Sequence, residues 1–266
     1  MSATIHELAV VHPNARLGGG VEIGPFCVVG PDVALGARTR LISHVSLVGR
    51  TQIGPDCTLH PFVSIGHPPQ DTKHGGGDVS VTIGARNILR EKVNIHPGSD
   101  AGRRETVVGN DNLFMVGAHV AHECVVGDNV VLTNSVALGG AVEVGDYAIL
   151  GGLSAVVQFC RIGRHAFVGG QTLVTRDVIP YGYALGSPAY LKGLNNVGLK
   201  RRDFSKNDIR TLRKAYGLLF ATEGTFANRL ADAAESYEDN PFIQDIVAFI
   251  RARENRELCQ PNHWSK

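Results

Sequence analysis

Aliphatic residues recur at every sixth position over most of this chain. The pattern covers residues 11–65, resumes in the same phase over 83–95, and continues with a shift of one residue over 108–174. Counted from the aliphatic residue as first position, these runs make 25 hexads, of which one, headed by Phe114, begins with an aromatic side chain. A period of six matches neither an α-helix nor the alternation of a single flat sheet.

Hexads of this kind predict a parallel β-helix, a solenoid whose triangular coils have three flat sides with one hexad on each. The first side chain of each hexad fills the interior, and a fifth residue, usually small or β-branched, packs beside it. Coils stack at about 4.8 Å, the spacing of neighbouring strands, so roughly eight coils make a column about 40 Å tall. Glycine often follows the aliphatic residue, as at Gly24 and Gly54, and is expected to permit a tight backbone at the corners.

The chain divides into a long repeat region and a shorter tail. We expect an all-β solenoid over residues 1–186, with insertions at 71–82 and 101–107, followed by a small α-helical C-terminal domain over 187–266. Ser205 is a candidate cap of the main helix, and further helical stretches cover 224–236 and 241–257. Proteins with this hexapeptide pattern are known as left-handed parallel β-helices. The resemblance implies the same hand here, although crossovers between parallel strands are normally right-handed.

Composition excludes several classes of protein. The formal net charge is +1, so no overall field favours nucleic acid. No apolar run approaches the roughly 18 residues of a membrane span, and the N-terminus lacks the pattern of a signal peptide. The five cysteines form no CxxC pair, and four of them occupy the inward fifth position, where small buried thiols are expected. We therefore expect a cytoplasmic protein with no nucleic-acid partner and no membrane span.

The insertions decide which hexads share a side. If both bulge out of the column, the hexads that contain His96, His122, Gly140 and Gln158 stack on one side. His122, at the outward third position, then has His96 one coil below, Gly140 one coil above and Gln158 two coils above. His119 is expected to close the preceding side, near the corner.

This side offers chemistry for a proton transfer. His122, with Glu123 directly after it, suits a general base whose tautomer the carboxylate sets. Gly140 can bring a backbone N–H close to a developing oxyanion. His96, and Lys73 from the first insertion, can bind anions. No serine or cysteine here is placed as a nucleophile, which favours direct attack by a substrate hydroxyl over a covalent intermediate.

Some residues keep more than one interpretation. His122 could instead be a metal ligand or an incidental surface histidine, and His119 has either a role in the site or a packing role. The basic run at residues 200–202 is either a solvated helix entry or a phosphate site, since arginine matches phosphate in a bidentate manner.

Longer segments resemble one family far more specifically than the hexads do. They are Ser64-Ile65-Gly66 leading to Gln70-Asp71-Thr72-Lys73, Asn94-Ile95-His96, Ala118-His119-Val120-Ala121-His122, Gln158-Phe159-Cys160 and Gly198-Leu199-Lys200-Arg201-Arg202. Over nearly the whole length, the chain resembles the acyl-ACP:UDP-N-acetylglucosamine O-acyltransferases that open lipid A synthesis in Gram-negative bacteria.

The resemblance implies a homotrimer with active sites in the clefts between neighbouring columns. His122 matches the base that takes a proton from the glucosamine 3-hydroxyl of UDP-N-acetylglucosamine, and Gly140 matches the oxyanion donor. The 3-hydroxyacyl chain arrives on the phosphopantetheine of acyl carrier protein, so no separate cofactor and no metal is implied. Gly170 matches the position that limits acyl length, and its small size predicts a longer chain. The substrate-binding positions correspond to Asp71, Lys73, His96, His119, Gln158, Asn195 and Arg201.

The chain departs from the family pattern at a few positions. Glu123 stands where aspartate is common, and its longer side chain can still reach the imidazole. Ala141 and Val157 stand where relatives can carry histidines, so neither is given a catalytic role. Val197 replaces an acidic residue of the nucleotide-binding segment.

Three other functions compete with this one. The related N-acyltransferase of the same pathway carries an extra N-terminal domain and would lack this tail. A trimeric β-helical carbonic anhydrase would bind zinc through histidines such as His96, His119 and His122. A purely structural solenoid would not explain why polar residues concentrate on one side.

Overall fold

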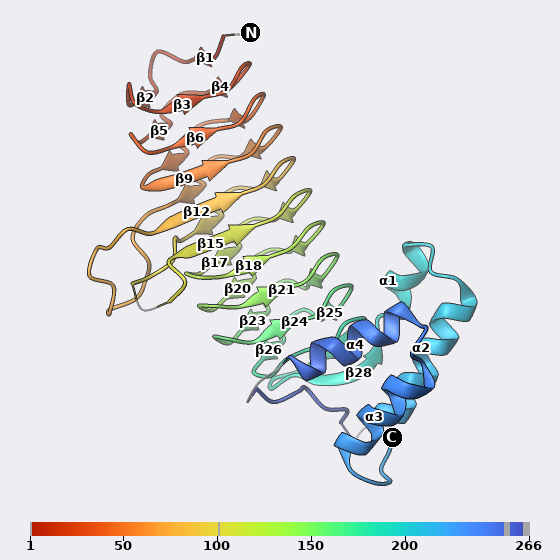
Figure 1. Cartoon of the computed structure of the whole chain (residues 1–266). Coiled ribbons are helices and arrows are strands. Elements are labelled where there is room, and N and C mark those ends of the chain that lie inside the picture. The colour runs from red at the N-terminus through yellow and green to blue at the C-terminus, as the bar shows by residue number, and fades with distance from the viewer. Residues whose placement is uncertain (1, 101, 253–255, 263–266) are drawn as a thin grey trace.

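The chain forms a column of stacked triangular coils with a group of helices at its C-terminal end (Figure 1). The computed structural model describes residues 2–100, 102–252 and 256–262. In Figure 1 the strands on the near side run from left to right while the chain descends from its N-terminus, so the coil is left-handed. The left-handed parallel β-helix predicted from the hexads is confirmed.

Within the described residues, each side of the column is one sheet with parallel pairing between successive coils. Sheet A contains β1 (Thr4–Ile5), β4 (Glu22–Ile23), β7 (Arg40–Leu41), β10 (Thr58–Leu59), β13 (Ile88–Leu89), β16 (Leu113–Phe114), β19 (Val131–Leu132), β22 (Ile149–Leu150), β25 (Phe167–Val168), β27 (Gly182–Leu185) and β28 (Tyr190–Leu194). Sheet B contains β2 (Val10–Val11), β5 (Val28–Val29), β8 (Ser46–Leu47), β11 (Ser64–Ile65), β14 (Asn94–Ile95), β17 (His119–Val120), β20 (Ala137–Leu138), β23 (Ala155–Val156) and β26 (Leu173–Val174). Sheet C contains β3 (Arg16–Leu17), β6 (Ala34–Leu35), β9 (Arg50–Ile53), β12 (Ser80–Ile83), β15 (Glu105–Val108), β18 (Val125–Val126), β21 (Glu143–Val144) and β24 (Arg161–Ile162).

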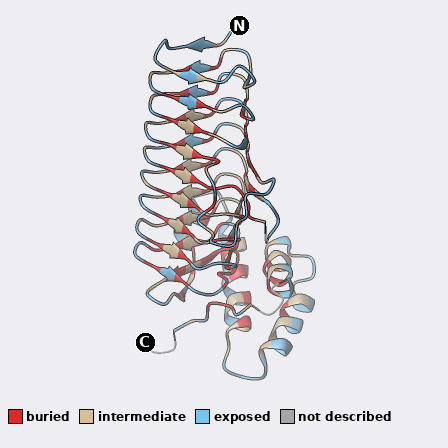
Figure 2. Ribbon diagram, turned by 90° about the vertical axis from the view of Figure 1, so that its left-hand side faces the viewer, coloured by how far each residue is buried: buried red, intermediate tan, exposed pale blue. Residues whose placement is uncertain are grey.

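The hexad determines which side chains enter the column. First and fifth residues face the interior, as Val120 and Cys124 do, and both are fully buried. Figure 2 shows buried and more exposed residues alternating along the coils. Most strands hold only the sixth residue of one hexad and the first of the next, as in β17. The four cysteines at fifth positions are buried free thiols, as predicted.

The corners correct one prediction. The left-handed backbone falls on the fourth position of the hexad, usually not glycine: Glu123 has φ 60° and Phe159 has φ 67°. Gly24, at a second position, is not among the residues with positive φ. A Cβ atom on Gly24 would overlap the carbonyl oxygen of Ile42 in the next coil. Glycine is required there by the close approach of two coils, rather than by a tight turn.

Both insertions leave the column after strands of sheet B, but they are shorter than predicted. Residues 80–82 belong to β12 and residues 105–107 to β15. At the end of each insertion the backbone is already extended and pairs with the strand of the coil below. Ala101, the first residue of the second predicted insertion, lies outside the described residues. The first insertion contacts the residue directly before the second, since Asp100 accepts hydrogen bonds from the N–H groups of Gly75 at 2.7 Å and Gly77 at 3.3 Å.

The tail begins with a hairpin rather than a helix. Strands β27 and β28 pair in antiparallel fashion and continue sheet A, so the boundary expected after residue 186 falls inside this hairpin. The helices that follow are α1 (Asn196–Arg201), α2 (Lys206–Leu219), α3 (Phe226–Ser236) and α4 (Pro241–Arg251). Ser205 caps α2 as predicted, since its hydroxyl accepts a hydrogen bond from the Asp208 N–H.

The chain after α4 returns to the column. Helix α4 is shorter than the predicted stretch 241–257, of which residues 253–255 lie outside the described residues. Leu258 bridges to Asp177, which follows the last strand of sheet B, and so partly covers the open end of the solenoid. None of the described helices is long and apolar enough to cross a membrane.

Candidate functional site

A pocket of about 310 Å³ opens at the corner that follows strand β17 of sheet B. The stacking predicted from the two insertions is confirmed, because Ile95 pairs with Val120 and Val120 with Leu138. The pocket walls therefore come from successive coils, together with Gln70, which directly precedes the first insertion. Those walls include His96, His119, His122, Gly140, Gln158 and Gln70.

His122 lies in the turn between β17 and β18, with its side chain 14% exposed. Its Nδ1 atom lies 2.5 Å from Oε2 of Glu123, a buried carboxylate whose other oxygen accepts a hydrogen bond from the Ser99 N–H. A carboxylate only accepts, so Nδ1 carries the proton and Nε2 has a free lone pair. This is the tautomer a general base needs. The prediction that the longer glutamate reaches the imidazole is confirmed.

Gly140 lies against the imidazole from the coil above. A Cβ atom at this position would lie 2.7 Å from Nε2 and 3.0 Å from Nδ1 of His122. Only glycine therefore leaves the ring in place. No described group accepts a hydrogen bond from the Gly140 N–H, although the Gly140 carbonyl accepts one from Phe159. A backbone donor is thus free beside the nitrogen that would take a proton.

His119 does not lie on the side predicted for it. It does not close the preceding side but lies on β17, because the strand begins at the sixth position of a hexad. Its side chain faces outward into the pocket, and Nδ1 lies 3.0 Å from Oδ1 of Asn94 in the coil below. Burial, together with His96 and His122, lowers the pKa of His119. A neutral imidazole is therefore expected near pH 7.

His96 is buried, and its Nδ1 donates to the Pro68 carbonyl at 2.9 Å. That bond leaves Nε2 as an acceptor, which is buried without a partner among the described residues. Burial is the main cause of the lowered pKa of His96. A neutral ring binds anions poorly, so the anion-binding role expected from the sequence does not fit. An acceptor for a hydroxyl or amide hydrogen fits better.

Other predicted residues lie outside this pocket of the single chain. Asp71 and Lys73 sit together in the first insertion, where the Lys73 N–H donates to Asp71 Oδ1 at 2.9 Å. Asn195 is buried, caps α1 and donates to the His165 carbonyl. Arg201 ends α1, and Gly170 lies in the turn after β25, at the opposite edge of sheet B.

The cysteines offer no nucleophile. Burial raises the pKa of the Cys124 thiol to about 12 and that of Cys160 to about 11. Cysteine reacts as the thiolate, so these groups are inert near neutral pH. Among the described residues, no three His, Cys, Asp or Glu side chains are grouped to hold a metal ion.

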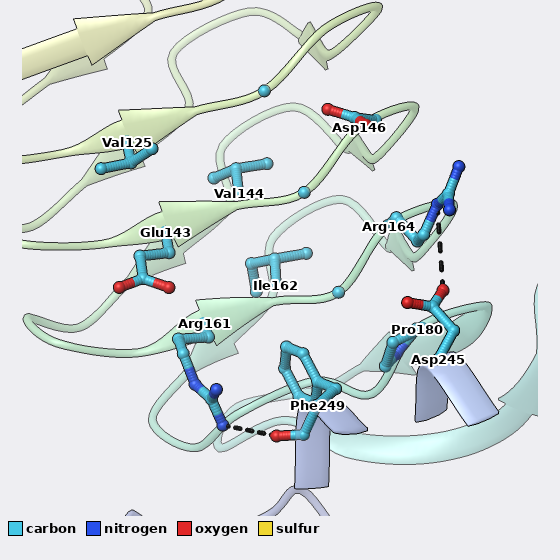
Figure 3. Close-up of a pocket in the computed structure, with 13 residues that line it drawn as sticks. Val125, Glu143, Val144, Asp146, Arg161, Ile162, Arg164, Pro180, Asp245 and Phe249 are labelled. Carbon is cyan, nitrogen blue, oxygen red and sulfur yellow. Dashed lines mark hydrogen bonds and ion pairs between the residues drawn. The ribbon is translucent and has the colours of Figure 1, made fainter. Parts of the chain in front are cut away.

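A second hollow, of about 390 Å³, lies between sheet C and helix α4 (Figure 3). Its charged residues hold the helix to the column. Arg161 pairs with buried Asp177 at 2.7 Å, donates to the Phe249 carbonyl at 3.0 Å and lies over the Phe249 ring. Arg164 lies 3.9 Å from Asp245. These side chains are already paired, which indicates a structural junction.

Three residues of the site were not predicted from the sequence. Gln70 lines the pocket directly before Asp71, so the matched segment could have suggested it. Asn94 meets His119 because both occupy the sixth position in adjacent coils, a relation the register contains. Ser99, the fifth residue of the hexad headed by Ile95, contacts Glu123 through its backbone N–H, a contact that hydrophobic periodicity does not predict.

A left-handed column of hexads, with a carboxylate-held imidazole at one corner and a free backbone N–H above it, defines a hexapeptide-repeat acyltransferase. Residues 177–259 match the family model described as UDP-N-acetylglucosamine O-acyltransferase, domain 2. Two relatives named acyl-[acyl-carrier-protein]–UDP-N-acetylglucosamine O-acyltransferase are 52% identical over 258 residues, from Caulobacter vibrioides, and 48% identical over 262 residues, from Azorhizobium caulinodans. These alignments cover 97% and 96% of this chain and 98% and 97% of the relatives. The chain belongs to this O-acyltransferase family.

Solved structures agree with the assignment. The UDP-N-acetylglucosamine O-acyltransferase of Moraxella catarrhalis is 38% identical with a TM-score of 0.92, over 97% of this chain and 99% of that one. The Francisella novicida UDP-N-acetylglucosamine acyltransferase is 35% identical with a TM-score of 0.94, over 98% and 95%. The likeness includes the helical tail, which the competing N-acyltransferase was expected to lack.

Proposed function

We propose that this protein transfers a 3-hydroxyacyl chain from acyl carrier protein to the 3-hydroxyl of UDP-N-acetylglucosamine, the first step of lipid A synthesis. The observation that carries the proposal is the buried Glu123–His122 pair beneath the unpaired N–H of Gly140. The names of the relatives supply the two substrates. The donor brings its own phosphopantetheine thioester, so the reaction needs no resident cofactor.

The geometry supports a single displacement. Nε2 of His122 accepts the proton of the sugar hydroxyl while that oxygen attacks the thioester carbonyl. The resulting oxyanion lies within reach of the Gly140 N–H, and Glu123 stabilises the imidazolium. Collapse breaks the carbon–sulfur bond, and the proton on Nε2 passes to the departing phosphopantetheine thiolate. A buried carboxylate and a free donor are thus ready before the substrate binds.

The remaining pocket residues suit the acceptor sugar. The unpartnered Nε2 of His96 can accept a hydrogen bond from a sugar hydroxyl or from the N-acetyl amide. His119 on β17 and Gln158 in the turn after β23 present polar groups above it. Replacing His96 removes this acceptor without touching the base, so it should affect KM more than kcat.

The pocket is too small for both whole substrates. Its 310 Å³ lies at the lower end of ligand pockets, which span roughly 300–1,000 Å³, whereas a nucleotide sugar and an acyl chain together need more room. We propose that neighbouring columns of a homotrimer complete the site. Asp71, Lys73, Asn195, Arg201 and Gly170, which lie outside the pocket of one chain, then contact the nucleotide and the acyl chain.

Mixed trimers test this arrangement. His122→Ala and Arg201→Ala chains, each nearly inactive alone, should regain part of the activity when co-expressed, because some sites then combine intact residues from two chains. Light scattering should report three chains per particle. A monomer, or mixed trimers no more active than the two parents, would contradict the shared site.

The base assignment is tested with His122→Ala in an acyl-transfer assay with carrier-linked substrates. We expect a loss of about 10²–10⁴-fold in kcat. His12→Ala is the matched control, since His12 is exposed after β2 of the same sheet and its ring accepts a hydrogen bond from the Asn14 N–H of its own turn. More than about a tenth of the activity left in His122→Ala, or stoichiometric zinc in purified protein, would overturn the proposal.

We place the reaction in the cytoplasm. The five cysteines are free thiols, which suits a reducing compartment. Recovery of the native protein in a periplasmic fraction would contradict this location.

A further inference from the structure

The second insertion lies on the carboxylate that orients His122. Ser99, itself buried, donates its backbone N–H to Oε1 of Glu123, while Oε2 faces His122. Gly102 packs against the same side chain: a Cβ atom there would lie 2.5 Å from Cδ, 2.6 Å from Oε1 and 2.9 Å from Cγ of Glu123. The three atoms nearest to that position all belong to Glu123. The insertion and the carboxylate are therefore fitted to each other.

From this contact we infer that Ser99 and Gly102 form a positioning clamp that fixes Glu123, and through it His122. The inference rests on the proposed function, in which His122 is the base. Glutamate has one more rotatable bond than aspartate, and an unrestrained side chain would not hold a ring nitrogen at one distance. The Ser99 N–H fixes one carboxylate oxygen, and the absent side chain of Gly102 leaves room for the extra methylene.

The clamp is itself supported. Asp100, between its two residues, accepts hydrogen bonds from Gly75 and Gly77 of the first insertion and faces His74 at 3.4 Å. The Gly102 N–H donates to the Ser99 carbonyl at 3.3 Å, closing a turn. Both insertions thus brace the carboxylate from outside the column. Neither Ser99 nor Gly102 reaches the pocket, so they act only through Glu123.

Gly102→Ala isolates this role. Gly102 is not among the residues with positive φ, so alanine adds overlap with Glu123 without straining the backbone. We expect kcat to fall about 10–100-fold, since displacement of a catalytic group by about 1 Å can cost 10²-fold, with KM within about threefold of wild type. Gly30→Ala serves as the control, because the nearest atoms to its Cβ lie at an ordinary 3.4 Å.

A double-mutant cycle separates positioning from general damage. In a Glu123→Asp background the shorter carboxylate withdraws from Gly102, so Gly102→Ala should change kcat by no more than about twofold. Equal losses in the wild-type and Glu123→Asp backgrounds would show that the glycine acts elsewhere, and would overturn the clamp.

A second readout does not depend on acyl transfer. In the intact protein labelled with ¹⁵N-histidine, wild-type His122 should carry its neutral-form proton on Nδ1, and Gly102→Ala should raise the share of the Nε2–H tautomer. If wild type lacks acyltransferase activity but the tautomer shifts, the proposed function fails and the clamp stands. If Gly102→Ala leaves both the tautomer and kcat unchanged, the clamp is wrong whatever the reaction.

Discussion

Gly140→Ala tests whether the coil above His122 determines where the imidazole sits. Alanine keeps the backbone N–H, so the proposed oxyanion donor survives the change. The added methyl group would lie closest to Cε1 of the imidazole and 2.7 Å from Nε2, whereas ordinary contacts of a Cβ atom begin at 3.4 Å. The ring must therefore retreat by at least about 0.7 Å, a shift comparable to the 1 Å displacements that can cost about 10²-fold in rate.

The retreat has a second cost. His122 is held at 2.5 Å from Glu123, and moving the ring away weakens this charge-assisted hydrogen bond. Such bonds contribute about 1.5–3 kcal/mol, and each 1.4 kcal/mol corresponds to a factor of ten. Both estimates point to a loss of about 10–100-fold in kcat. Overpacking of one methyl group also costs about 1–3 kcal/mol of folding stability, so the folding of the variant is checked beside its activity.

The assay compares kcat and KM of wild type, Gly140→Ala and Gly30→Ala with the same carrier-linked donor. Gly30 follows β5 at the same corner of a lower coil, where a methyl group meets nothing closer than 3.4 Å. Thermal melting checks that all three proteins are folded at the assay temperature. A kcat for Gly140→Ala within threefold of wild type would refute the close packing of glycine against the base.

Three further predictions follow from other parts of the molecule. His96→Ala should raise KM for the sugar nucleotide about tenfold with little change in kcat, whereas His12→Ala should change neither, and equal effects of the two would contradict an acceptor role. Gly170→Met should shift preference to shorter acyl chains, since among the described residues only Gly152 lies within 4 Å of its Cβ, and an unchanged ranking in a chain-length panel would refute this. Burial lowers the pKa of His165 to about 4, so protonation opposes folding and stability falls as pH drops below about 6.5. Urea unfolding at pH 7.0 and 5.5 should show wild type losing about 1 kcal/mol more than His165→Phe, and parallel losses would rule this out.

The faces of the column were predictable because the interior fixes the register. Each first-position side chain must enter the same core. If an insertion shifted a later hexad out of register, the apolar side chains of that hexad would be exposed to solvent. Counting hexads across two insertions therefore placed His96, His122 and Gly140 in adjacent coils. The pairing of Ile95 with Val120 confirms that count.

The position of the turn within the hexad was not predictable from the same pattern. Hydrophobicity shows which residues point inward, but it does not show where the backbone changes direction between them. The hexad pattern therefore predicts the wrong side for His119. Strand β17 contains the last residue of one hexad and the first residue of the next. The role of Gly24 was mistaken in a similar way, since its absent side chain serves the neighbouring coil.

The conformation of the insertions also lay beyond sequence reasoning. Neither carries a repeat, and their contacts are made with residues distant along the chain, such as Gly102 with Glu123. For Lys73 the predicted side is correct but the predicted contact is not. Its insertion leaves the column from sheet B, yet its side chain does not line the pocket of its own chain. Charged residues in a loop indicate binding but not the direction in which they point.

Glu123 departs from the family pattern because a longer carboxylate replaces the aspartate common there. The structure shows that its length is matched by its surroundings, since Gly102 leaves space beside Cδ and Ser99 takes up the second oxygen. Glutamate at position 123 therefore requires glycine at position 102. An aspartate with Gly102 would leave a gap and an unpaired Ser99 N–H, and a glutamate with alanine at 102 would be overpacked, so Gly102→Ala should lower kcat much more beside Glu123 than in the Glu123→Asp variant.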